Sequence, residues 1–342
     1  MTSVTALLLL LLLLFLLSIT SSSAEVVYSL SVCDSFFLEG TPPQIPGILE
    51  GGKILNQNQY KPICQTYKNK RMFLTLYDIN NKIPVFSAYK YRGEQERGRP
   101  KKGWMIEPQL ETERANKSMT RQDKRKTYDH QAVDNDYKHN GIFDRGHIFP
   151  SSHAFDKEEK RSTFTLTNIV PQAGSFNKGS WNRMETCIKC VMDRHCRDSN
   201  GHHEGFVVTG AQASSDDTLN DKVNVPSRLW SAFCCYSADT KTWMASAHWG
   251  HNVPDRSKDK YLPTRTLAEL HDKLGTADSE FEAFPGTQCP LHTTVSELYP
   301  QHHNCHCPPR PTASTSGPST AGSSSLIWAA PTWLAYMYHR AY

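Results

Sequence analysis

The sequence predicts an α+β fold built on a central antiparallel sheet. Five segments are rich in β-branched and aromatic residues, as strands are, and one segment has the periodicity of an amphipathic helix. The segments do not alternate as strand, helix, strand, which argues against a parallel sheet. With 342 residues, 38% of them hydrophobic, the chain can bury the core of one large domain or two small ones.

The expected strands fall in two groups. Residues 71–80 and 83–91 are separated by Asn81-Lys82, a spacing typical of a β-hairpin. Three more strands are expected at 205–212, 228–237 and 241–249.

Between the two groups of strands, residues 177–194 predict a helix. Its apolar residues recur at helical spacing and form one stripe: Trp181, Met184, Ile188 and Val191. Several strands mixed with few helices are typical of the α+β class.

The two ends of the chain differ in composition from the middle. An apolar run from Ala6 to Ile19 followed by Ser22-Ser23-Ala24 predicts a secretory signal peptide, residues 1–24. A membrane anchor is the alternative, but a span needs roughly 20 apolar residues and this run has 14. Residues 25–307 are then the expected folded domain, without a transmembrane span. Residues 308–342 are expected to form a Pro/Ser/Thr-rich disordered tail with a short apolar end.

The ten cysteines predict disulfides, because a secreted chain with an even number of cysteines usually pairs them. Zinc is the alternative, suggested by Cys187-x2-Cys190-x5-Cys196 and by the His/Cys cluster at 302–307. Neither cluster has a second pair at zinc-finger spacing, so disulfides are favoured. One glycosylation acceptor, Asn116-Lys117-Ser118, indicates a surface loop.

Positive charge is concentrated in one segment, although the net charge of +4 is mild. Lys90 to Lys126 contains 12 Lys or Arg against 6 Asp or Glu. Such a segment can contact phosphates electrostatically, and a solvated loop is the alternative.

A first polar motif, Asp144-Arg145-Gly146-His147, lies inside an apolar frame. A His can accept a proton near neutral pH because its unperturbed pKa is about 6.5. Arg145 lies two residues before His147, so in a strand both side chains point to the same face. A cation beside a proton acceptor suits attack on an anion such as a phosphodiester. The alternative is a core His next to a surface Arg.

A second polar motif runs Asn168-x3-Gln172-x4-Asn177-x3-Trp181-x3-Glu185. In the expected helix, Asn177 and Glu185 share a flank, with Trp181 packed between them. An amide oxygen and a carboxylate make a sparse site for Mg²⁺, which keeps several waters of its own. An N-capped amphipathic helix with a solvated Glu is the alternative.

Together the two motifs resemble the DNA/RNA non-specific endonuclease family, whose core is a ββα-metal (His-Me) finger. The family signature Asp-Arg-Gly-His stands at 144–147, and its downstream Asn, Gln, Asn, Trp and Glu follow without a gap. Two further stretches, Cys33 to Cys64 and Phe86-Ser87-Ala88-Tyr89, resemble the endonuclease domain-containing 1 branch of the family. The resemblance covers roughly residues 33–290 and implies a ββα-metal nuclease core on the antiparallel sheet.

The resemblance also implies catalytic roles. His147 would be the general base that takes a proton from the attacking water. Arg145 would neutralise charge on the phosphate, and Asp144 belongs to the same catalytic set. Asn177 would be the one direct ligand of Mg²⁺, and Glu185 would hold the metal through water.

Further assignments concern the substrate. Asn168 and Gln172 would line the substrate site together with Arg145. Trp181 would serve packing, and the bulky Phe149 is expected to narrow substrate access. An additional phosphate-contacting arginine is expected upstream, with Arg121 and Arg125 as candidates.

These roles predict a secreted, extracellular endonuclease that uses one Mg²⁺, with Mn²⁺ as an alternative metal. It would hydrolyse phosphodiester bonds of DNA or RNA without reading bases, and would leave 5′-phosphate ends. One alternative is a secreted binding protein that keeps the fold but is catalytically weak or inactive. Another is a disulfide-rich adhesion or matrix domain, which does not explain both motifs. The presence of every motif position favours the nuclease.

Overall fold

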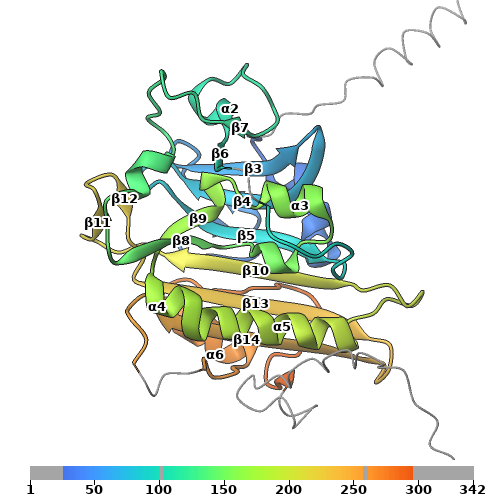
Figure 1. Cartoon of the computed structure of the whole chain (residues 1–342). Coiled ribbons are helices and arrows are strands. Elements are labelled where there is room, and N and C mark those ends of the chain that lie inside the picture. The colour runs from blue at the N-terminus through green and yellow to red at the C-terminus, as the bar shows by residue number, and fades with distance from the viewer. Residues whose placement is uncertain (1–25, 101–102, 257–260, 296–342) are drawn as a thin grey trace, which may run out of the picture. The chain divides into compact units, whose positions relative to one another are not determined.

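A six-stranded antiparallel sheet runs through the computed structural model, which describes residues 26–100, 103–256 and 261–295 (Figure 1). Its strands are β3 (Tyr60–Tyr67), β4 (Lys70–Asp78), β5 (Ile83–Tyr91), β10 (Gly205–Gln212), β13 (Arg228–Ser237) and β14 (Thr242–His251). Their order is β14-β13-β10-β5-β4-β3, and every neighbouring pair is antiparallel. The α+β prediction is therefore confirmed. The predicted signal peptide, 1–24, and the predicted tail, 308–342, lie outside the described residues.

The expected strands are all present. Strands β4 and β5 form the predicted hairpin, and Lys82 in its turn has a φ of 56°. The predictions for β10 and β13 match their bounds, and β14 begins one residue later than expected and ends two residues later. Strand β3 was not predicted, because Lys61 and Pro62 weaken its apolar pattern.

One face of the sheet carries a small hairpin followed by a helix, here called the hairpin–helix unit. It consists of β8 (Phe143–His147), β9 (Ile169–Ala173), α4 (Gly174–Phe176), η6 (Asn177–Trp181) and α5 (Asn182–His195). Strands β8 and β9 pair antiparallel, with His147 opposite Ile169. This order of two strands and a helix is the ββα arrangement that the family resemblance implied.

The predicted helix at 177–194 is present but begins irregularly. Residues 177–181 form a turn of π-helix in which Gly179 has non-helical angles, φ −101° and ψ −112°. The regular helix α5 starts only at Asn182. Its predicted apolar stripe is buried throughout, with Trp181 only 1% exposed, which confirms the packing role of that residue.

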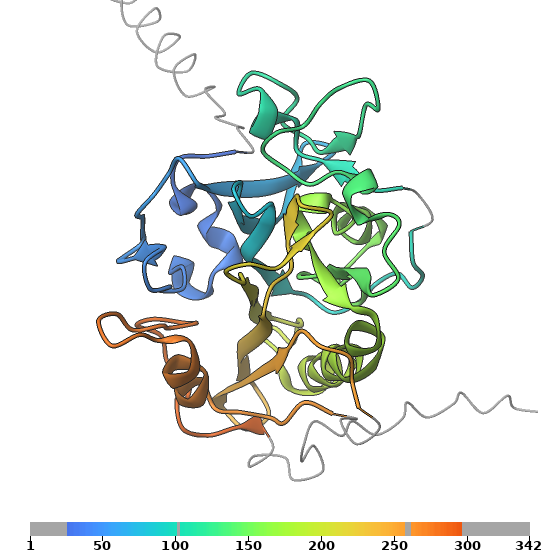
Figure 2. The ribbon, with the colours of Figure 1, turned by 90° about the vertical axis from the view of Figure 1, so that its left-hand side faces the viewer.

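The opposite face of the sheet is covered by both ends of the described chain, and is called the disulfide face. The covering elements are η1 (Leu30–Phe36), η2 (Leu38–Gly40), β1 (Leu49–Glu50), β2 (Lys53–Ile54) and α6 (Leu267–Leu274). Figure 2 shows the blue and orange segments on one side of the sheet and the green hairpin–helix unit on the other. Successive strand residues alternate between the two cores: Phe73 packs toward the hairpin–helix unit and Leu74 toward the disulfide face.

Short elements complete the described chain. They are β6 (Met105–Ile106), α2 (Pro108–Glu111), β7 (Thr120–Arg121), η3 (Asp134–Tyr137), η4 (Ser151–His153), α3 (Lys157–Ser162), η5 (Leu166–Asn168), β11 (Thr218–Leu219) and β12 (Val223–Asn224). In the loop before β7, Asn116 is exposed, as expected for the glycosylation acceptor. Its modification stays a prediction.

Disulfides join distant parts of the chain. They pair Cys33 with Cys64, Cys196 with Cys235, and Cys234 with Cys289. Cys187 is disulfide-bonded as well, so the zinc interpretation of the 187–196 cluster is wrong. Among the described cysteines Cys190 is free, so the expectation of full pairing does not hold there. Cys305 and Cys307 lie outside the described residues.

Candidate active site

Strand β8 carries the Asp-Arg-Gly-His motif, and position 146 requires glycine for steric reasons. A Cβ atom on residue 146 would overlap the side chain of Gln172 on the neighbouring strand. Only glycine therefore lets β8 and β9 pair here with Gln172 in place. The close pairing fixes the two residues that flank Gly146, namely Arg145 and His147.

A cavity of ≈ 450 Å³ opens beside β8. Five residues predicted for the site line this cavity: Asp144, Arg145, His147, Asn177 and Glu185. Side chains from the hairpin and from the helix thus meet at one place, although 30 to 41 positions separate the lining residues of β8 from Asn177 and Glu185. The cavity is the candidate active site.

His147 lies partly buried between two aromatic rings. Its ring centroid is 5.4 Å from that of Trp104 and 4.9 Å from that of Phe164. The Nε2 atom is buried and makes no hydrogen bond within the described chain. Burial, and to a lesser degree the nearby Arg99 cation, lower the pKa of His147 to about 3. The imidazole is therefore neutral, and able to accept a proton, over the whole physiological range of pH.

Arg145 is held from three sides. Its Nη2 atom donates to the backbone oxygen and to Oδ1 of Asp134, both at 2.9 Å. Its guanidinium carbon lies 5.4 Å from the centre of the Tyr137 ring and 5.8 Å from that of Trp104. The ion pair with Asp134 and the two neighbouring rings restrict the rotation of the guanidinium, so it stays at the cavity.

Asp144 connects β8 to the start of the helix. Its carboxylate forms an ion pair with Lys178 Nζ at 2.8 Å and accepts a hydrogen bond from Asn177 Nδ2 at 3.3 Å. When Nδ2 donates to Asp144, the amide oxygen of Asn177 is left to accept from, or bind, something else. Asp144 thereby orients Asn177.

The irregular turn at 177–181 is fixed from outside the helix. Asp255 accepts hydrogen bonds from Ser180 N at 2.7 Å and Ser180 Oγ at 2.8 Å. A Cβ atom on residue 179 would overlap the Asp255 carboxylate, so Gly179 leaves room for this contact. The helix is therefore irregular between Asn177, which lies in η6, and Glu185, which lies in the regular helix α5. Turns of π-helix are frequent at functional sites.

Glu185 is a carboxyl group without an ion-pair partner among the described residues. No described side chain forms an ion pair with it, and burial raises its pKa to about 8. The indole of Trp181 and the charge of Arg99 oppose that rise, but the Trp181 N–H makes no well-formed hydrogen bond. A partly buried carboxyl group without an ion-pair partner in the described chain suits a site that receives a cation.

The donors at the cavity are hard oxygen atoms. The oxygen of Asn177 and the carboxylate of Glu185 suit Mg²⁺ or a similar ion better than zinc, which prefers nitrogen and sulfur. Within the described residues, no group of three or more His, Cys, Asp or Glu could hold a metal ion. These residues therefore fit an ion that keeps much of its own water, and do not fit a fully caged metal.

Two residues predicted to line the substrate site are instead enclosed. Asn168 is 0% exposed; its Oδ1 accepts from Phe149 N at 2.9 Å and its Nδ2 donates to Phe149 O at 3.0 Å. It holds the chain just beyond His147. Gln172 is also 0% exposed and fills the space above Gly146, with neither polar atom hydrogen-bonded. Neither residue is among those that line the cavity.

One other expectation needs correction. Phe149 does not narrow the cavity: it is fully buried and stacks on Tyr89 with ring centroids 3.8 Å apart. The nearby His153 has a structural role. Its ring joins the hydroxyl of Tyr89 to the backbone oxygen of Glu185, with both contacts at 2.8 Å. His153 therefore supports the turn of α5 that carries Glu185.

Several residues that line the cavity were not predicted from the sequence. Two of them, Arg99 and Trp104, belong to the basic segment Lys90 to Lys126. Composition pointed to the segment but not to these residues. The others are Pro150, Ser151, Ser152, Lys178 and Asn182. The candidates Arg121 and Arg125 do not line the cavity, and Arg125 forms an ion pair with Asp123 instead.

Comparison with known proteins identifies similar nucleases. The family model described as "DNA/RNA non-specific endonuclease" matches residues 50–288. The chain is 31% identical over 209 residues to the endonuclease domain-containing 1 protein of Homo sapiens, which covers 59% of this chain and 38% of that protein. It is 35% identical over 113 residues to the mitochondrial nuclease EXOG of Xenopus laevis, covering 29% of each.

A solved structure is also similar. The crystal structure of the EndoG/EndoGI complex contains a chain that aligns with a TM-score of 0.41 and 18% identity, covering 55% of this chain and 75% of that one. The match to the human relative spans well under half of that relative's length. Within the described part of the chain, no helix has the length and apolar composition needed to cross a membrane.

Proposed function

The chain belongs to the DNA/RNA non-specific endonuclease family, and on that premise we propose that it is a magnesium-dependent endonuclease that cuts without reading sequence. The observation that carries the proposal is the single cavity lined by His147, Arg145, Asn177 and Glu185. The complete set favours catalysis over the alternative of a protein that only binds a partner.

In the proposed reaction, a water molecule attacks the phosphorus of a phosphodiester. His147 accepts the proton of that water as the new phosphorus–oxygen bond forms. The bond to the 3′-oxygen breaks, and this oxygen keeps the electron pair and takes a proton from solvent. The products are a 3′-hydroxyl and a 5′-phosphate, and His147 later returns its proton to solvent. Arg145, fixed between Trp104 and Tyr137, faces the charge that builds on the phosphate oxygens.

Asn177 is the proposed direct ligand of the metal, and Glu185 would hold the metal through water. A bound Mg²⁺ supplies positive charge that stabilises the phosphate and the departing oxygen. Asp144 acts through Asn177, because it accepts from the amide nitrogen and leaves the amide oxygen free. With magnesium as the ion, Mn²⁺ should substitute and Zn²⁺ should substitute poorly.

The low pKa of His147 describes the cavity without substrate. A general base works best with a pKa near the working pH. An anionic phosphodiester beside the ring would favour the imidazolium and raise this pKa. Substrate binding would thus turn a weak base into a better one, and the acid limb of kcat/KM is not expected near 6.5.

Backbone contacts would extend beyond the cavity. Arg99 also lines an adjoining hollow of ≈ 350 Å³, whose other cations include Arg97, Lys157 and Arg161. Phosphates that follow the scissile one could lie along this basic hollow. DNA and RNA would both be accepted, since such contacts address the phosphate backbone.

This extension predicts a role for Arg99. Arg99→Ala should lower kcat/KM about tenfold and flatten its salt dependence, because a phosphate contact is lost. The matched control is Arg125→Ala, from the same basic segment but ion-paired away from the cavity. Cleavage of a labelled oligonucleotide at several salt concentrations measures both variants; equal effects would contradict the assignment.

Secretion is part of the proposal. The apolar run at the N-terminus supports a signal peptide. The three described disulfides support an oxidising compartment, because such bonds form and persist there.

The test of the function uses the protein purified from culture medium. Plasmid DNA and RNA are incubated with it in magnesium, in excess chelator, and in chelator followed by magnesium. Cleavage should occur in magnesium, stop in chelator and return on re-addition, and Asn177→Ala should abolish the response. Full cleavage in excess chelator would overturn magnesium dependence, and no cleavage of either substrate would favour the binding protein.

A further inference from the structure

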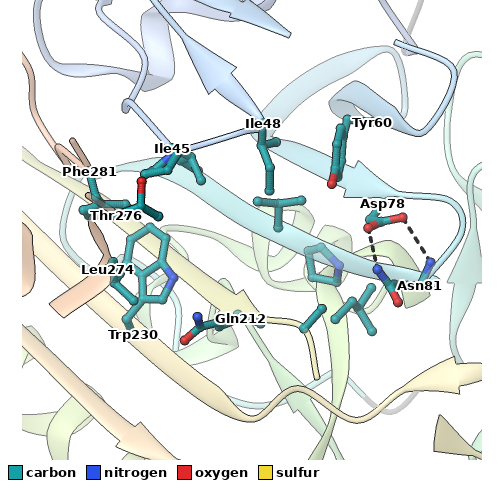
Figure 3. A pocket seen from close by; sticks show the side chains of 16 residues that line it. Ile45, Ile48, Tyr60, Asp78, Asn81, Gln212, Trp230, Leu274, Thr276 and Phe281 are labelled. Carbon is teal, nitrogen blue, oxygen red and sulfur yellow. Dashed lines mark hydrogen bonds between the residues drawn. The ribbon is translucent and has the colours of Figure 1, made fainter. Parts of the chain in front are cut away.

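A second cavity lies on the disulfide face, away from the residues that line the candidate active site. Its volume is ≈ 230 Å³, somewhat below the range of about 300–1,000 Å³ common for ligand sites. Figure 3 shows its walls, which come from β3, the β4–β5 hairpin, the β1 region, β10, β13 and the chain around α6. Ile45, Ile48, Leu274 and Phe281 make the walls mostly apolar.

Two hydrogen-bonding groups in this cavity have no partner among the described residues. Trp230 is only 3% exposed, yet its indole N–H makes no hydrogen bond within the described chain. The hydroxyl of Tyr60 likewise makes none there. Figure 3 shows both groups turned toward the space between them. An apolar wall with a few convergent polar groups is the usual construction of a small-molecule site.

The charges of the lining select against an anion. No Lys, Arg or His is among the described residues that line the cavity, and Asp78 contributes a carboxylate. That carboxylate already accepts four hydrogen bonds, from Asn80 N, Asn81 N, Asn81 Nδ2 and Gln59 Nε2. It is therefore not free to bind a ligand, and it repels phosphate.

We propose that this cavity binds a small, neutral, mostly apolar molecule that accepts hydrogen bonds from Trp230 and Tyr60. The molecule is not a nucleic-acid substrate, because nothing in the lining neutralises a phosphate. The proposal is independent of the nuclease function and concerns different residues.

The test compares two fluorinated probes of nearly equal shape, 2-(4-fluorophenyl)acetamide and 2-(4-fluorophenyl)acetate. Only the second is charged at pH 7. Binding to the full protein is followed by ¹⁹F line broadening of the probe and by the ¹⁵N-labelled indole signals of the seven tryptophans. The signal lost in Trp230→Phe identifies the indole of Trp230.

The amide should shift the Trp230 indole signal in a saturable way and bind at least about tenfold more tightly than the carboxylate. Tyr60→Phe and Trp230→Phe should each weaken the amide by about 3- to 10-fold, the usual worth of one hydrogen bond. Trp243→Phe, a tryptophan outside the cavity, is the matched control and should not weaken it. Tyr60 is partly exposed, so its variant tests the proposal even if Trp230→Phe does not fold.

Three results would overturn the proposal: an unmoved Trp230 signal at millimolar amide, equal binding of the carboxylate, or unchanged affinity in Tyr60→Phe. Each can be read without any nuclease assay.

Discussion

The two faces of the sheet differ in the kind of groups that they bury. The hairpin–helix unit contains buried polar atoms without hydrogen bonds, among them Arg145 Nε, His147 Nε2 and both polar atoms of Gln172. Each such atom costs about 1–3 kcal/mol. The disulfide face packs apolar residues and is crosslinked by Cys33–Cys64 and Cys234–Cys289. The core of the hairpin–helix face is crosslinked as well, by Cys196–Cys235. We infer from the unpaired polar atoms that the hairpin–helix face carries the proposed chemistry, while the disulfide face contributes mainly to stability.

The first prediction asks whether activity and stability separate in this way. His147→Ala should lower the cleavage rate by roughly 10²–10⁴, the usual worth of a positioned acid–base group. The free energy of unfolding should change by less than about 1 kcal/mol, because the lost packing is offset by removal of an unpaired buried nitrogen. Plasmid nicking and urea denaturation measure the two effects.

The control for this variant is His292→Ala, an exposed histidine away from the cavity. His153→Ala cannot serve, because His153 bridges Tyr89 and the backbone of Glu185. If His147→Ala and His292→Ala nicked plasmid equally well, the motif on β8 would not be the active site.

The second prediction tests the disulfide face. Replacing Cys33 and Cys64 together with serine should lower the free energy of unfolding by about 2–5 kcal/mol. Activity measured well below the melting temperature should change little, because this bond lies on the face opposite the cavity. Cys190→Ser, which removes the free thiol, is the control and should be nearly neutral. Loss of activity in a still-folded double variant would contradict the separation of the faces.

The third prediction concerns acid. Burial lowers the pKa of His153 to about 4 and that of His248 to about 3. Unfolded histidines have a pKa of about 6.5, so below that pH the unfolded chain binds more protons than the folded one. The stabilisation is complete above pH 6.5 and is lost as the pH falls toward 4. Each buried histidine should cost about 2 kcal/mol between pH 6.5 and 5.

Urea denaturation at pH 7 and pH 5 checks this sign and size. His248→Asn is less stable at neutral pH but should lose about 2 kcal/mol less than the parent on acidification. The control His292→Ala, at an exposed position, should lose as much stability between pH 7 and pH 5 as the parent. An identical pH dependence in His248→Asn would show that this histidine titrates normally in the fold.

The sequence carried most of the fold and the centre of the site. Long strands such as β10 and β13 were predicted because their buried, β-branched runs are local signals. The motif spacing brought His147 and Asn177 together, since a hairpin and a helix in succession leave few alternatives.

What the sequence could not supply depends on contacts between distant segments. Arg99 and Trp104 reach the cavity only through the folding of a loop whose pattern resembles any basic surface. Asp255 fixes the turn at Gly179 from 75 positions away, and no local rule predicts that contact. The enclosed positions of Asn168 and Phe149 likewise follow from how β8 packs on the sheet.

The fourth prediction has the smallest effect and addresses Glu185. It contrasts two glutamates, the buried Glu159 and the partly buried Glu185, by the cation available to each. Glu159 is 3% exposed but is paired with Arg92 Nη2 at 2.8 Å, so the protein supplies its cation. Glu185 has no such partner among the described residues, and burial raises its pKa to about 8. At pH 7 it is therefore mostly protonated until a cation enters.

Magnesium binding should then release close to one proton at pH 7, and its apparent affinity should rise about tenfold per pH unit from 6 to 7.5. Calorimetry in two buffers of different ionisation enthalpy measures the released proton. Glu185→Gln keeps the shape but has nothing to release, so its weaker binding should not depend on pH in this range. Glu159→Gln should leave the proton release intact if the variant folds. Proton release that persisted in Glu185→Gln would mean that another group loses the proton when the metal binds. That result would contradict the assignment of the released proton to Glu185.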